Sequence, residues 1–144
     1  MVAPTPATFP LRSLHPLHAT LLGFPLPLFL GALVSDLAYS STFQVQWANF
    51  SSWLIAAGLV GGGFALIGAT VNLLSARDTS RRQRYVYFVM LLAMCIFGLI
   101  NAFVHGKDAH ATMPEGIYLS ALVTVFALLA AWIGYSGFPG RQGR

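Results

Sequence analysis

The stretch YVYFVMLLAMCIFGLINAFVH, from Tyr85 to His105, contains no Asp, Glu, Lys or Arg. It is long enough to cross the hydrocarbon core of a bilayer as a helix, which takes about 20 apolar residues. Three more stretches have the same character, and they run Leu17–Tyr39, Ser52–Leu74 and Ile117–Tyr135. Asp36 is the one formal charge inside them. The sequence therefore predicts an all-α integral membrane protein built as a four-helix bundle.

The composition excludes a soluble domain. Hydrophobic residues make up 56% of the chain, charged residues make up 8%, and the mean hydropathy is +0.69. Soluble domains are about one quarter charged. Four spans leave only short connections in 144 residues. We therefore expect one transmembrane domain at 15–137, a mobile cytoplasmic lead at 1–14 and a basic cytoplasmic tail at 138–144, with no separate catalytic module.

The arginines predict the orientation. If the spans alternate, seven of the eight basic residues share one side, and Lys107 alone lies opposite. The seven are Arg12, Arg77, Arg81, Arg82, Arg84, Arg141 and Arg144. Basic residues in short loops stay in the cytoplasm, so both termini are expected inside. The four arginines of the second connection can also attract anionic lipid headgroups, at about 1 kcal/mol each. They belong to no recognisable nucleic-acid-binding module, so nucleic acid is not an expected partner.

Proline and glycine mark bends and close helix contacts. Pro25 and Pro27 remove backbone donors and predict a kink in the first half of the first span. They also interrupt the apolar run after Arg12, so we do not expect a cleaved signal peptide. Gly58 and Gly62 form a GxxxG pair, which suits close approach of another helix. We expect this approach within the bundle, and a homo-oligomer interface is the alternative.

Polar residues within the membrane are expensive, so any function is expected to involve them. Asp36 lies near the expected outer end of the first span, and Asn101 and His105 lie on one face at the outer end of the third. The simplest interpretation is an ion pair of Asp36 with His105 or Lys107. A metal site using Asp36, His105 and His110 is an alternative, because imidazole and carboxylate ligands suit zinc and other transition metals. A proton relay through Asp36 or His105 is a third.

At the expected inner end, His15 and His18 are candidate cofactor ligands three residues apart. A haem held between His18 and His105 is not expected, because the two lie near opposite boundaries of a core about 30 Å thick. An interfacial role beside Tyr85 and Tyr87 is the simpler interpretation.

No catalytic pattern accompanies these residues. Cys95 is the only cysteine, which excludes a disulfide within the chain. Ser51 and Ser52 have no general base at a predictable distance in the sequence. We therefore do not expect an enzyme.

Several motifs together resemble a bacterial family of small four-helix membrane proteins known as domain of unknown function 2231. The motifs are His15-Pro16-Leu17, Phe24-Pro25, Gly31, Asp36, Trp53–Gly61, Val104-His105, Lys107-Asp108, Ala111–Pro114 and Trp132–Gly134. The resemblance implies the fold and a bacterial inner-membrane location, and fusion of some relatives to cytochrome-like modules implies a redox partner. It also marks His15 and Asp36. The chain departs from the family at Tyr85 and Tyr87, where many relatives have His, and at Asn72, where an Asp is common nearby.

These observations predict a small non-enzymatic membrane protein of structural or accessory type. The first alternative is a metal- or haem-associated redox subunit that uses the outer Asp and His residues. The second is an oligomeric transporter or proton pathway, since four spans offer little polar lining within one chain.

Overall fold

The computed structural model describes residues 16–75, 81–107 and 112–136, and helix dominates these ranges. The described helices are α1 (Pro16–Gly23), α2 (Pro25–Thr42), α3 (Val45–Leu74), α4 (Arg81–His105) and α5 (Glu115–Tyr135). Four helical segments are long and apolar enough to cross a membrane: Ala19–Thr42, Val45–Leu74, Arg81–His105 and Glu115–Tyr135. The predicted all-α fold with four spans is confirmed.

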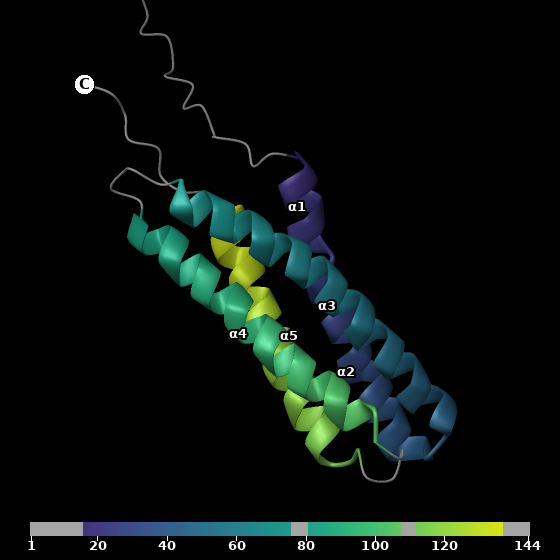
Figure 1. The fold of residues 1–144 in the computed structure, drawn as a ribbon. Helices are drawn as coiled ribbons and strands as arrows, with labels where there is room; N and C mark the ends of the chain where they lie inside the picture. The colour runs from purple at the N-terminus through teal and green to yellow at the C-terminus, as the bar shows by residue number, and fades with distance from the viewer. Residues whose placement is uncertain (1–15, 76–80, 108–111, 137–144) are drawn as a thin grey trace, which may run out of the picture.

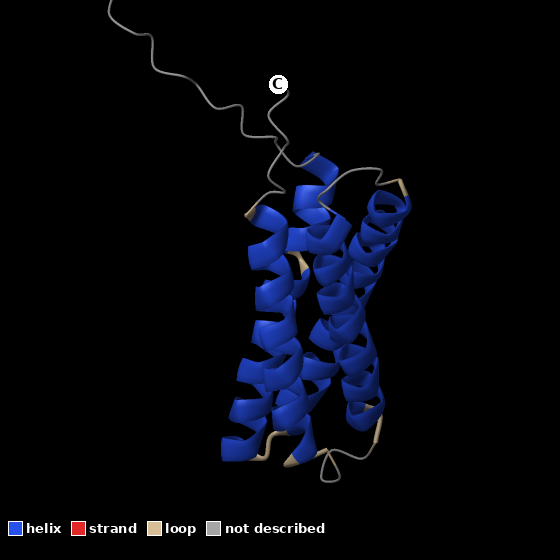
Figure 2. Cartoon of the chain, turned by 90° about the vertical axis from the view of Figure 1, so that its left-hand side faces the viewer, coloured by secondary structure: helices blue, strands red, loops and turns tan. Residues whose placement is uncertain are grey.

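The four long helices form one elongated bundle (Figures 1 and 2). Each of α2, α3, α4 and α5 packs against the next in chain order, and α5 closes the ring against α2. Consequently α2 faces α4 across the centre, and α3 faces α5. We call the end where α2 leads into α3 the distal end. The other end, where α1 lies, is the proximal end (Figure 1).

The first predicted span is two helices rather than one. Phe24 separates α1 from α2, and Pro25 is the first residue of α2. Proline is favourable in a first helical turn, where its missing N–H has no helical partner to lose. The predicted kink is therefore present as a break. It lets α1 pack against α3, α2 and α5 at the proximal end.

Helix α3, which contains the second predicted span, begins earlier than the apolar stretch indicated. The expected start was Ser52, whereas α3 begins at Val45 and continues for 30 residues. Thirty residues of helix span about 45 Å, which exceeds the roughly 30 Å of a hydrocarbon core. Hydropathy identifies the apolar part of a helix, and the first turns of α3 contain polar residues such as Gln46 and Asn49. The prediction was wrong here because a helix can extend beyond its apolar part.

Glycines let the helices of the bundle approach closely. A Cβ on Gly58 would lie 3.0 Å from the ring of Phe29, which is fully buried. A Cβ on Gly62 would lie 2.6 Å from the terminal carbon of Met94. Gly58 and Gly62 thus face the interior, as expected for packing within the chain. Close approach of small residues is the usual way helices associate in lipid, where no hydrophobic force drives them together.

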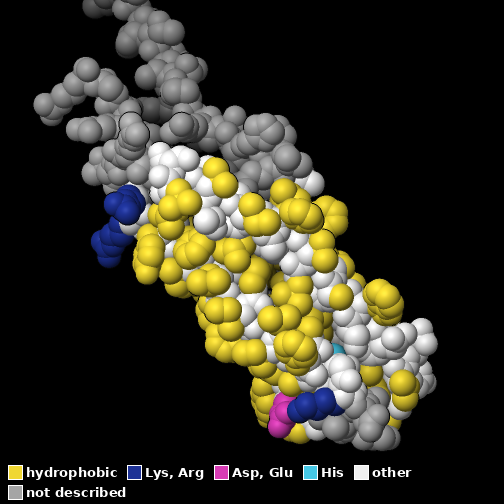
Figure 3. Space-filling view, viewed as in Figure 1, with side chains coloured by type: hydrophobic (Ala, Val, Ile, Leu, Met, Phe, Trp, Pro, Cys, Tyr) yellow, Lys and Arg dark blue, Asp and Glu magenta, His cyan; other side chains and the backbone are white. Residues whose placement is uncertain are grey.

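The outer surface of the bundle is apolar. Figure 3 shows hydrophobic side chains along its length, with the visible charged side chains at the two ends. Trp53, Phe103, Tyr118 and Trp132 are each at least 70% exposed. A soluble monomer rarely exposes so large a contiguous apolar surface. Lipid is the solvent that suits it.

Candidate functional site

Asp36 is a completely buried carboxylate near the distal end of α2. The Ser120 hydroxyl of α5 donates a hydrogen bond to its Oδ2 at 2.5 Å. Its Oδ1 lies 2.8 Å from Nε2 of His105, the last residue of α4. Both carboxylate oxygens therefore have partners on other helices. This is the compensation that a buried acid needs inside a membrane.

His105 has an acceptor at each ring nitrogen. Nδ1 lies 3.0 Å from the backbone carbonyl of Asn101, one turn earlier in α4. A carbonyl oxygen can only accept, so Nδ1 bears a hydrogen. Nε2 faces Asp36 and also lies 3.3 Å from the Ser51 hydroxyl of α3. The protonation of Nε2 therefore depends on the carboxylate opposite it.

Five polar side chains, one or two from each spanning helix, meet at this point. We call them the distal polar cluster: Asp36 from α2, Ser51 from α3, Asn101 and His105 from α4, and Ser120 from α5. The contact of Asp36 with His105 joins α2 to α4 across the centre of the bundle. The Asn101 amide donates to the Ser120 hydroxyl at 2.9 Å, and the Ser51 hydroxyl lies 3.2 Å from the carbonyl of Ala32. The cluster thus connects all four spans.

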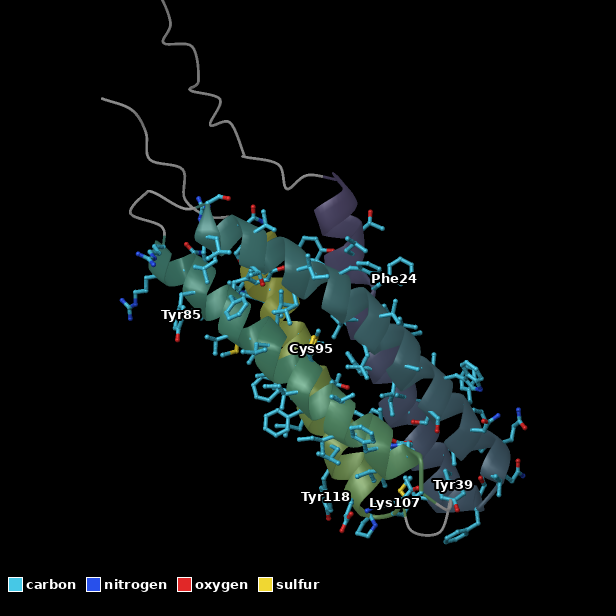
Figure 4. The ribbon with its side chains drawn as sticks, viewed as in Figure 1. Phe24, Tyr39, Tyr85, Cys95, Lys107 and Tyr118 are labelled. Atoms are coloured by element: carbon cyan, nitrogen blue, oxygen red, sulfur yellow. The ribbon has the colours of Figure 1, made fainter. Side chains whose placement is uncertain are left out.

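Two buried polar atoms at the distal end, one of them in the cluster, have no hydrogen-bond partner among the described residues. They are Asn101 Oδ1 and the Tyr39 hydroxyl. Tyr39 is one turn beyond Asp36 in α2, and Figure 4 shows it with Lys107 at the distal end. Buried polar atoms without partners are costly. They mark this end as the polar part of an otherwise apolar interior.

Gly116 lets α5 pack directly against His105. A Cβ at this position would lie 3.0 Å from His105 Cε1 and 3.0 Å from Thr112 Cγ2. Thr112 and His105 are both buried. The imidazole is therefore packed against α5 at Cε1 and contacts Asp36 of α2 through Nε2.

We expect Gly116→Ala to displace His105 and to lower the free energy of unfolding by about 1–3 kcal/mol, the usual cost of overpacking. The matched control is Gly63→Ala in α3, where a Cβ would meet nothing within 4 Å. Unfolding of the two variants in detergent, followed by circular dichroism, makes the comparison. Equal stability of the two variants would show that the packing of Gly116 against His105 does not matter.

The predicted outer residues are only partly brought together. Asp36 and His105 form the expected ion-pair contact, whereas Lys107 is exposed at the distal end. His110, the third metal candidate, lies outside the described residues, as does Asp108. Within residues 16–75, 81–107 and 112–136, no group of three or more His, Cys, Asp or Glu side chains could hold a metal ion.

The inner candidates fall outside what the structure describes. His15 lies outside the described residues, and the side chain of His18 is likewise not described. Their expected companions differ from each other, because Tyr85 is 58% exposed while Tyr87 is buried in the core. Tyr87 therefore faces the interior of the bundle, whereas Tyr85 faces outward. The helix α1 that contains His18 lies at the end of the bundle opposite the C-terminus of α4 (Figure 1).

Sequence reasoning missed Ser120 and set Ser51 aside for want of a base. The structure places His105 Nε2 3.3 Å from Ser51, so an imidazole is within reach. The available signal was depth, since Asp36, Ser51 and Ser120 each lie within about one turn of the distal boundary of a predicted apolar stretch. Residues at equal depth in neighbouring helices can meet if they face inward.

A family model described as "Predicted membrane protein (DUF2231)" matches residues 14–137. The matched range contains all the described helices and the whole distal polar cluster. No curated protein and no solved structure matches the chain. The match covers most of the sequence and agrees with four apolar helices of membrane-spanning length. The chain therefore belongs to the DUF2231 family of predicted membrane proteins.

Proposed function

We propose that this protein is a non-enzymatic membrane protein of structural or accessory type, which presents a lipid-facing bundle locked at its distal end. The observation that carries the proposal is the distal polar cluster, in which Asp36 and His105 join the diagonal helices while Ser51 and Ser120 approach from the other two. Polar contacts between spans hold helices together in lipid. A rigid bundle with apolar sides is suited to packing beside another membrane protein.

The geometry of the cluster favours this role over hydrolysis. In a serine hydrolase the acid holds Nδ1 of the histidine, and the serine faces Nε2. Here Asp36 and Ser51 both face Nε2, and Nδ1 is directed at the Asn101 carbonyl. Nε2 is therefore engaged by the acid and is not free to take a proton from serine. All three side chains are also buried, with no more than 9% of any of the residues exposed.

The orientation that suits this role has both termini in the cytoplasm of a bacterial cell, with the protein in the inner membrane. Arg81 and Arg82 are exposed at the proximal end, while Arg84 donates to the carbonyl of Asn72. Exposed arginines at this end would lie beside anionic headgroups of the cytoplasmic leaflet.

We expect cysteine labelling to report this orientation. In a Cys95→Ala background, Lys107→Cys should react with a membrane-impermeant thiol reagent in intact cells. Arg82→Cys should react only after permeabilisation, because positive residues in short loops remain inside. The native side chains of Arg82 and Lys107 are both exposed, so a difference in labelling would not arise from burial within the protein. The reverse pattern would contradict the proposed orientation.

Measurements on the purified protein test the proposed structural or accessory role. We expect no Soret band, no stoichiometric metal and no ion flux in proteoliposomes. A Soret band or bound metal would instead favour the redox subunit, for which the proximity of Asp36 and His105 is the supporting observation. Flux above that of empty liposomes would favour a transporter or proton pathway. Asp36→Asn is the matched variant for each measurement, since a signal that arises in the distal polar cluster should change with it.

A further inference from the structure

The hydrogens of the distal polar cluster can be assigned from the geometry, with one left to place. Nδ1 of His105 bears a hydrogen because it faces a carbonyl. Oδ2 of Asp36 bears none, because it accepts from Ser120, whose oxygen in turn accepts from the Asn101 amide. The remaining position is the 2.8 Å contact between Asp36 Oδ1 and His105 Nε2. One hydrogen must lie there, on one atom or the other, for the contact to be a hydrogen bond.

We propose that the distal polar cluster is a proton-binding site in which one proton is shared between Asp36 and His105, and that binding of a second proton releases α2 from α4. With one proton the pair has no net charge whether the proton is on oxygen or on nitrogen. Neutrality is what the apolar interior favours, because an uncompensated charge there is costly. The inference does not depend on the accessory role proposed above.

The Ser51 hydroxyl has an acceptor at either position of the shared proton. When Nε2 is protonated, the Ser51 hydroxyl donates to the Ala32 carbonyl at 3.2 Å. When the proton is on Asp36, the single lone pair of Nε2 accepts from Oδ1–H, and the Ser51 hydroxyl, 3.3 Å from Nε2, still donates to the Ala32 carbonyl. Ser51 therefore does not compete for the shared proton.

A second proton cannot be accommodated in this geometry. Oδ2 faces the donor Ser120, so a proton added to Asp36 goes to Oδ1. Oδ1–H and Nε2–H would then point at each other across 2.8 Å, with a net positive charge buried between them. Donors that face each other repel, and the charge favours hydration. The contact between α2 and α4 should open as a result.

The other ionisable groups described near the pair lie on α2, on α5 and just after the end of α4. On α2, Tyr39 is buried one turn from Asp36. Lys107 follows α4, and Glu115 and Tyr118 belong to α5, and all three are exposed. The described part of α3 contributes Ser51 and no acid or base. The exposed groups are screened by water.

The first test is nitrogen NMR of histidine-labelled full-length protein in lipid nanodiscs. The His105 signals are identified by their loss in His105→Gln, since the chain has four histidines. At neutral pH we expect Nδ1 to be protonated and Nε2 to have a shift between the protonated and unprotonated limits. Asp36→Asn should move it to the unprotonated limit, because the amide donates to Nε2. A fully protonated or a fully unprotonated Nε2 in the parent protein would overturn the sharing.

The second test measures the opening. Spin labels at Leu37→Cys on α2 and Ile100→Cys on α4, in a Cys95→Ala background, occupy exposed positions. We expect the distance between the labels to increase on acidification and to return on neutralisation. His105→Gln, whose amide can still donate to Asp36, should lose this change while keeping the neutral distance. An unchanged distance in the parent, or the same change in His105→Gln, would refute the release of α2 from α4.

Discussion

Asp36→Ala should lower the free energy of unfolding by about 3–5 kcal/mol, the cost of removing one partner from a buried pair. The substitution leaves His105 Nε2 and the Ser120 hydroxyl buried without the acceptor that each now has. It also removes the polar contact between α2 and α4. Unfolding in mixed detergent micelles, followed by circular dichroism, measures the loss.

Asp36→Asn is the informative comparison. An amide has the same shape as the carboxylate, so its oxygen can accept from Ser120 while its NH₂ donates to an unprotonated Nε2. We therefore expect it to cost only about 1 kcal/mol. If Asp36→Ala proved as stable as Asp36→Asn, the cluster would not be what holds the distal end together. The Asp36→Ala, Ser120→Ala double variant measures the coupling energy between the two residues. The stability losses of residues in one hydrogen-bond network are not additive.

The apolar stretches predicted the fold well because lipid imposes a simple rule. A long apolar segment that crosses lipid by itself must satisfy its backbone hydrogen bonds within the segment, which only a helix does, so hydropathy is enough to locate four helices. Proline at positions 25 and 27 likewise predicted the interruption between α1 and α2. The early start of α3 was not predictable in this way, because its first turns at Gln46 and Asn49 are helical without being apolar.

The candidate site was predictable only in part. Asp36 and His105 are ionisable groups at matching ends of two spans, so their contact followed from depth alone. Ser120 was not identified because a serine in a membrane helix needs no partner outside its own helix. The Ser35 hydroxyl, for example, donates to the Gly31 carbonyl one turn earlier. Telling the two situations apart requires the rotation of each helix about its axis, which the weak amphipathicity of an apolar span does not reveal.

The rotation of each helix about its axis also determines which glycines are needed for helix packing. Gly58 and Gly63 both lie in α3, five residues apart, in a segment where the sequence offers Gly61 and Gly62 as well. The structure separates them, because a Cβ on Gly58 would contact the buried ring of Phe29 whereas one on Gly63 would meet nothing within 4 Å. Two identical substitutions in one helix are therefore expected to have opposite effects.

Gly58→Leu should destabilise the bundle by about 3 kcal/mol, at the upper end of the usual cost of overpacking, since α2 and α3 must move apart to admit the side chain. Gly63→Leu should leave stability unchanged or raise it by up to about 1 kcal/mol, because leucine is a better helix former than glycine and faces lipid here. Thermal unfolding of the two variants in the same detergent makes the comparison. A loss of stability or of oligomer mass in Gly63→Leu would instead place this face of α3 at an interface between chains.

A compensating substitution at Phe29 tests whether Gly58→Leu destabilises the bundle through a steric clash with that ring. Phe29→Ala alone should cost about 3–5 kcal/mol, because it leaves a cavity at a fully buried position. Combined with Gly58→Leu, it provides the space that the leucine needs, so the double variant should be more stable than the sum of the two single losses predicts. Strict additivity would mean that Gly58 and Phe29 do not pack against each other. The contact between α2 and α3 would then have to be assigned to other residues, and the intramolecular role of the GxxxG pair would fail with it.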